Sequence, residues 1–102
     1  MIDANKFLGW CEARYSRLSQ IAEIVMRAPD STARSELFQA ILAALANCVD
    51  MVVEMNALAN EHHVAGRSAR DFTLPIDVEA IDAADADIHL RALVLSPAAG
   101  AA

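Results

Sequence analysis

Two cysteines are the first residues of this chain whose type and spacing suggest chemistry. Cys11 and Cys48 both fall on apolar rows of predicted helices. If these helices form an antiparallel hairpin, the two cysteines face each other to within about one residue along the helix axis. A facing pair could form a redox-sensitive cross-link between the helices. The alternative is a pair of small buried thiols that stay reduced in the cytosol.

A second candidate is a histidine near the end of the longest apolar stretch. His62 is followed four residues later by Gly66. This spacing resembles the phosphohistidine segment of histidine phosphotransfer domains, which are helical bundles of similar size and carry a lysine just before that glycine. Ala65 occupies the lysine position here, so the charge that would screen a phosphoryl group is missing from it. The resemblance covers a short segment and implies, as an alternative function, a phosphotransfer-like or other small-site enzyme centred on His62.

Other catalytic or metal-binding arrangements find little support in the spacing. The acidic cluster of Asp82, Asp85 and Asp87 lacks the glycine and the terminal glutamate of a calcium loop. The sequence contains no Glu-x-x-His pair of the di-iron type and no Cys-x-x-Cys pair. No serine sits in a nucleophile elbow, and glycine is too scarce for a phosphate cradle. We therefore expect no metal, no cofactor and no catalytic residue, and a protein that is not an enzyme.

Charge and composition narrow the classes of partner. The 102 residues carry a net charge of −6, which argues against binding to nucleic acid and to anionic lipid. Residues 1–35 balance to +1 and residues 36–102 to −7, so the acidic part is a candidate for meeting a basic partner or serves solubility alone. The longest unbroken apolar run, 40–46, is far shorter than a membrane span, and nothing resembles a signal peptide. The composition predicts a soluble, cytoplasmic protein.

One long helix, predicted over residues 32–65, organises the chain. The segment contains no glycine or proline, begins after Pro29 and stops at Gly66. Its apolar residues form three adjacent rows, so the helix is expected to pack on more than one neighbour. At the standard rise it would be about 50 Å long, more than a compact domain of this size needs.

Two further helices are predicted, at residues 3–28 and 77–95, with no sheet. The short break at Pro29 makes the first two helices antiparallel neighbours, and large apolar residues then face each other at every level. The third helix has acidic residues in its N-terminal half, which is expected to face water. The fold class is all-α: a long helical hairpin plus a third helix, forming a three-helix bundle completed by dimerisation. Residues 1–95 form one domain, and residues 96–102 are expected to be a disordered, alanine-rich tail.

Arg14 interrupts the apolar row of the first helix. The hairpin arrangement places it near Asn47 and Asp50, and predicts an ion pair between Arg14 and Asp50. Such a pair would fix the register of the helices or contact a partner. The alternative is an arginine whose stem packs while its charged end reaches solvent.

The apolar residues are too many for one small core, so some are expected to lie on an interaction surface. Six residues are assigned to this surface: Val49, Met51, Met55, Leu58, Leu90 and Leu93. A two-fold dimer would bury them without creating an open chain of contacts. The sequence therefore predicts a small acidic adaptor or chaperone-like protein, non-catalytic, that binds itself as a homodimer and also another protein.

Overall fold

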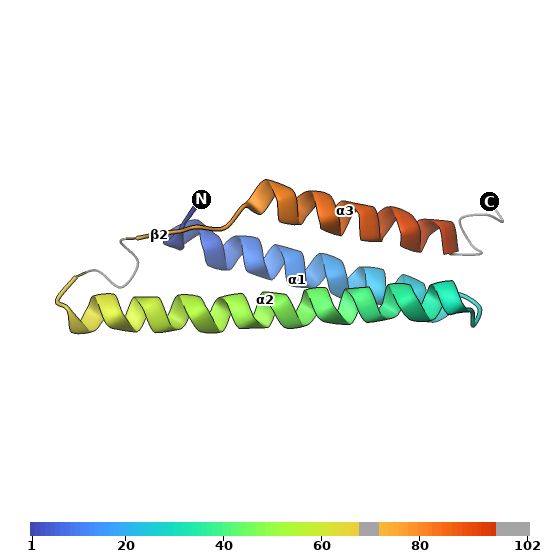
Figure 1. Ribbon diagram of the computed structural model, residues 1–102, viewed down its shortest axis with the longest axis horizontal. Helices are drawn as coiled ribbons and strands as arrows, with labels where there is room; N and C mark the ends of the chain where they lie inside the picture. The colour runs from blue at the N-terminus through green and yellow to red at the C-terminus, as the bar shows by residue number, and fades with distance from the viewer. Residues whose placement is uncertain (68–71, 96–102) are drawn as a thin grey trace.

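The computed structural model describes residues 1–67 and 72–95 as three helices and one short pair of strands. Helix α1 spans Ala4–Arg27, α2 spans Thr32–Val64 and α3 spans Val78–Leu95. Figure 1 shows α1 and α2 as an antiparallel hairpin, with α3 lying along it and α2 extending beyond the start of α1. The described molecule is a rod of 58 × 19 × 17 Å. The predicted all-α class, with a long hairpin and a third helix, is confirmed.

Local capping explains where the hairpin helices begin and end. Asp3 caps α1 by accepting a hydrogen bond from the backbone N–H of Asn5, and Ser31 caps α2 by accepting one from the N–H of Arg34. At the far end of α2, Gly66 adopts a positive φ of 78°, and the N–H of Arg67 donates to the carbonyl of His62. This left-handed residue satisfies the last carbonyls and turns the chain out of the helix, as predicted for Gly66.

The expectation of no sheet is wrong at one end of the bundle. Strands β1 (Ile2–Asp3) and β2 (Thr73–Leu74) pair antiparallel, with Ile2 opposite Leu74. The N–H of Ala4 extends the pairing by donating to the carbonyl of Phe72. Leu74 is buried, and its position brings the backbone of β2 beside Ile2 and Asp3. The backbone N–H and C=O groups of the two strands then pair with each other. The predicted tail, residues 96–102, lies outside the described residues.

The buried side chains form two clusters along the rod. One lies near the strand pair and consists of Phe7, Cys11, Cys48, Met51, Met55 and Leu74. The other lies toward the α1–α2 turn and consists of Leu18, Ile21, Val25, Leu37, Ile41 and Ala92. The sequence predicts one apolar row on α1, and all of its members lie in these clusters: Phe7, Cys11, Leu18, Ile21 and Val25. Among the described residues, Ala92 is the fully buried member that α3 supplies, and Ile81, Ile88 and Leu95 pack partly buried against the clusters. Helices α1 and α2 are therefore the main packing pair.

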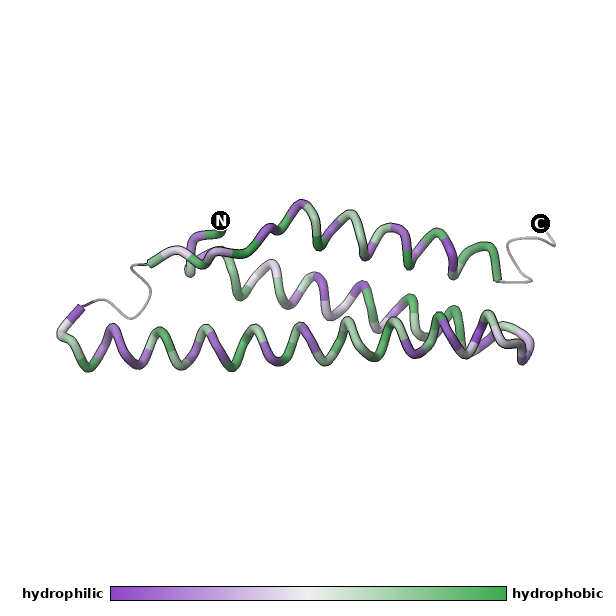
Figure 2. The backbone as a smooth tube through the Cα atoms, viewed as in Figure 1, coloured by the Kyte–Doolittle hydropathy of each residue, from purple (hydrophilic) through white to green (hydrophobic). Residues whose placement is uncertain are grey.

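Helix α2 is more apolar than its burial within the chain requires. Figure 2 shows hydrophobic residues recurring along its whole length. It is long and apolar enough to cross a membrane by length and composition, a test that core helices of soluble proteins also pass, and only 22% of its most apolar stretch is buried. Much of the apolar surface of α2 therefore has no covering within the part of the chain described.

Candidate functional site

A buried ion pair links the middle of α1 to α3. The Nε of Arg14 donates to Oδ2 of Asp85 at 2.7 Å, and both side chains are almost fully buried. Nη1 of Arg14 also donates to the side-chain oxygen of Asn47 at 2.9 Å, and the guanidinium lies 5.8 Å from the centre of the Trp10 ring. These partners compensate much of the cost of burying the charge. Together with Asn47 on α2, the pair joins three helices at one level of the bundle.

The predicted partner of Arg14 was only partly right. Asn47 is a partner, as the hairpin arrangement implies, but Asp50 is exposed and the carboxylate that binds Arg14 belongs to Asp85. The acidic half of α3 also does not face water throughout, because Asp82 accepts a hydrogen bond from the Trp10 ring N–H at 3.1 Å. The signal that could have revealed this is that Arg14 and Asp85 each interrupt an apolar row and carry opposite charges.

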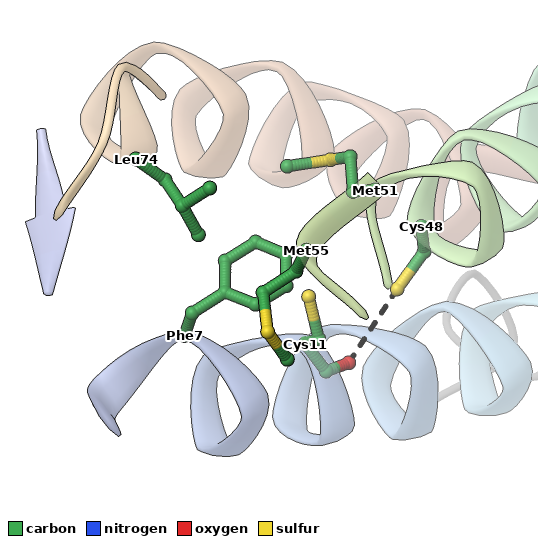
Figure 3. Close-up of a cluster of buried hydrophobic side chains, with 6 residues drawn as sticks. All are labelled: Phe7, Cys11, Cys48, Met51, Met55 and Leu74. Atoms are coloured by element: carbon green, nitrogen blue, oxygen red, sulfur yellow. Dashed lines mark hydrogen bonds between the residues drawn. The ribbon is translucent and has the colours of Figure 1, made fainter. Parts of the chain in front are cut away.

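The two cysteines lie where the hairpin arrangement places them. The Sγ of Cys48 lies 3.6 Å from the backbone carbonyl of Cys11 and donates a weak hydrogen bond to it (Figure 3). Both thiols are free and buried, and they pack against Phe7 and Met55. Burial and the neighbouring Cys48 raise the pKa of Cys11 to about 12, against the opposing effect of Arg14. Because the thiolate is the reactive form, this environment keeps Cys11 protonated and unreactive at neutral pH.

A groove runs between α1 and α2, and α3 contributes no residue to its lining. It encloses about 690 Å³ and is lined mainly by apolar atoms. Leu8 and Tyr15 line it from α1, and Val49, Val52 and Val53 line it from α2. Val49 and Val53 are 52% and 61% exposed, which is high for β-branched apolar residues at adjacent turns of one helix. Such a surface is suited to the apolar side of another helix.

The structure divides the six predicted interaction residues among separate places. Met51 and Met55 belong to the core, so their assignment to a surface is wrong; the wide apolar arc of α2 packs on both α1 and the β2 end. Leu58 is partly buried beside the same cluster. Val49 lies in the groove, whereas Leu90 and Leu93 are exposed on α3, which does not reach the groove. The sequence reading missed the α1 side of the groove, where Leu8 and Tyr15 form a row of their own.

His62 does not stand in an open site. Its ring packs against Phe72 with ring centres 4.7 Å apart, and its Nδ1 is buried without a hydrogen-bond partner among the described residues. The pairing places Phe72, the residue before β2, against the end of α2. Nothing in this geometry favours phosphoryl transfer, so that alternative stays a prediction.

Comparison with known proteins adds no assignment. The chain matches no family model, no curated protein and no solved structure. Within the described residues, the groove between α1 and α2 is the feature whose geometry is best suited to binding.

Proposed function

We propose that this protein is a non-catalytic helical interaction module, of the adaptor or chaperone-like kind, that binds another protein and associates with a second copy of itself. The observation that carries the proposal is the open apolar groove between α1 and α2. Contiguous exposed apolar surface is uncommon on a soluble monomer and marks interaction sites. A fourth helix laid in the groove would complete a four-helix arrangement, the usual way to bury such a face.

Self-association is assigned to the outer face of α3. Leu90 and Leu93 are 63% and 40% exposed there. Asp87 and Arg91 flank them, and both are exposed. An antiparallel two-fold pairing of α3 with its copy, centred near residue 89, sets Asp87 of each chain opposite Arg91 of the other. Such a surface is complementary to itself in charge, which a closed dimer requires.

The net charge of −6 supports the same proposal, with a protein as partner rather than nucleic acid or an anionic membrane. We also propose that the protein is located in the cytoplasm. It is supported by two free, buried cysteines that are not joined in a disulfide.

Light scattering coupled to size exclusion at micromolar concentration tests the self-association. We expect the mass of a dimer for the wild type and of a monomer for Leu90→Glu, because a carboxylate at the centre of the pairing would be buried opposite an apolar surface. Val49→Glu is the matched control, since it places the same charge in the groove and should leave the dimer intact. A monomeric wild type, or a dimer indifferent to Leu90→Glu, would contradict the proposed interface.

A further inference from the structure

The charges at the groove are of one sign. Among its lining residues the formally charged side chains are Glu12 and Glu23, both on α1 and both exposed. They are eleven residues apart, about three helical turns or on the order of 16 Å, so they lie on the same side of α1. Within residues 1–67 and 72–95, neither carboxylate takes part in an ion pair. The groove thus has an apolar floor and an edge with two carboxylates that form no ion pair within the described residues.

A second copy of this chain is a poor occupant of the groove. If two grooves met face to face, the interface would contain four carboxylates from Glu12 and Glu23 and no lysine or arginine from the lining. Carboxylates removed from water without a cation cost several kcal/mol each, and like charges facing each other add to that cost. The same edge repels anionic lipid.

From these observations we infer that the groove receives an amphipathic helix of a different protein, with lysine or arginine along one flank. This inference rests on the proposed function and names the chemistry of its partner. The apolar side of the incoming helix covers Val49, Val52 and Val53, and its basic flank lies along Glu12 and Glu23. Residues 8–23 of α1 line the groove, which corresponds to about four turns of a bound helix.

The side chains between the two glutamates suit close approach of a helix. Ser16 and Ser19 line the groove on the α1 side, and small residues allow helix axes to come near one another. Tyr15 is 49% exposed and offers an aromatic face, on which an arginine or lysine side chain can stack. Apolar burial supplies affinity in this arrangement, whereas the carboxylates select the partner and its direction.

Two synthetic peptides test the inference with the full chain. Both are amphipathic helices of about 18 residues with the same leucine and alanine face; one carries lysine on its flanks and the other glutamate. Binding is followed by fluorescence anisotropy of a label on the peptide, at low and at high salt. We expect the lysine peptide to bind at least tenfold more tightly than the glutamate peptide at low salt, with the difference shrinking as salt is added.

Variants of the protein that lack selected carboxylates test whether Glu12 and Glu23 attract the lysine peptide. Glu12→Gln with Glu23→Gln should weaken binding of the lysine peptide about three- to tenfold, the range for two partly exposed pairs. Glu36→Gln with Glu54→Gln removes the same two charges from exposed positions of α2 outside the groove, and should change binding less than about twofold. Val49→Asn with Val53→Asn adds no charge and should abolish binding of both peptides. Far-ultraviolet dichroism verifies that each variant is folded.

The outcomes separate this inference from the proposed function. If both peptides bind equally and both need the valines, the groove takes a helix but the charge inference is overturned. If the two pairs of glutamate variants weaken binding to the same degree, the attraction comes from net charge and the inference is likewise overturned. If neither peptide binds, the groove is not a helix-binding site and the proposed function falls with it. If binding requires dissociation of a dimer, a second copy occupies the groove, which also overturns the inference.

Discussion

Arg14 on α1 and Asp85 on α3 form an ion pair with an N–O distance of 2.7 Å inside the bundle, where both side chains are almost fully buried. The pair is the main polar link between the hairpin and its third helix. A buried pair of this kind adds little net stability compared with apolar residues in its place. Removing one partner is nevertheless strongly destabilising, because the other charge is then buried without compensation. The pair therefore helps to fix the position of α3 along the hairpin, because the two buried charges would have to separate before α3 could slide.

Removal of the carboxylate should destabilise the fold severely. We expect Asp85→Ala to lower the free energy of unfolding by about 3–5 kcal/mol, because the Arg14 guanidinium would be left buried with fewer partners. The measurement is urea denaturation followed by far-ultraviolet dichroism. Asp50→Ala, at the exposed position first predicted to pair with Arg14, is the matched control and should stay within about 0.5 kcal/mol of the wild type. Equal effects of the two variants would contradict the assignment of the pair.

The position of Asp85 could not be predicted from the sequence as fully as the hairpin could. The rows on α1 and α2 are clear, so the hairpin, the helix stop at Gly66 and the facing cysteines can all be predicted. Helix α3 has apolar residues on several faces, among them Leu90, Leu93 and Val94, so periodicity alone does not show which of its acidic residues turns inward. Tertiary contacts settle the matter, because Arg14 holds Asp85 in the interior and Trp10 donates a hydrogen bond to Asp82. The strand pair escaped prediction for a similar reason, since strands of two residues carry no periodic signal.

The same limit applies to the candidate site. The sequence indicated a surplus of apolar residues and placed Val49, Leu90 and Leu93 correctly on the exterior. It does not show that Met51 and Met55 are buried in the core, because their burial depends on which faces of α2 pack against α1 and against β2. The groove has residues from two helices, so no single row of either helix reveals it.

The cysteines predict a pH dependence of stability. Burial, with a smaller effect of Cys48, raises the pKa of Cys11 from 9.0 to about 12 in the folded chain. Above pH 9 the unfolded chain releases this proton while the folded chain retains it, so rising pH favours unfolding. The contribution is fully present below pH 9, and is lost between pH 9 and about 12 at up to about 1.4 kcal/mol per pH unit.

Denaturation of the wild type and of Cys11→Ser across this range provides the measurement. Other groups titrate there as well, so the informative quantity is the difference between the two proteins. We expect the wild type to lose stability more steeply than Cys11→Ser above pH 9. Alkylation at pH 8 should be slow in the folded protein and fast in urea, because the folded thiol is protonated and covered. Parallel stability curves together with rapid alkylation of the folded protein would show that Cys11 is neither buried nor perturbed.

Leu74 anchors β2 against the end of the bundle. It is 4% exposed and packs in the cluster around Phe7. Truncation in Leu74→Ala leaves a cavity between β2 and the hairpin, and we expect a loss of about 2–5 kcal/mol in the free energy of unfolding. The neighbouring Thr73 is exposed, so Thr73→Ala is the control and should change stability by less than about 0.5 kcal/mol. Thermal or urea denaturation distinguishes them, and a mild effect of Leu74→Ala would mean that β2 is not docked in solution.

The division between core and groove on α2 can be tested with one substitution at two positions. Met55 is 3% exposed in the core, whereas Val49 is 52% exposed in the groove, six residues earlier on the same helix. Glutamate at position 55 would bury a carboxylate without a cation. This costs several kcal/mol, which is a large part of the free energy of unfolding of a small domain. We expect Met55→Glu to be largely unfolded by far-ultraviolet dichroism, and Val49→Glu to keep its helix content and to melt within a few degrees of the wild type. If Val49→Glu unfolded as completely as Met55→Glu, Val49 would have to be buried in solution, and the face between α1 and α2 would already be filled.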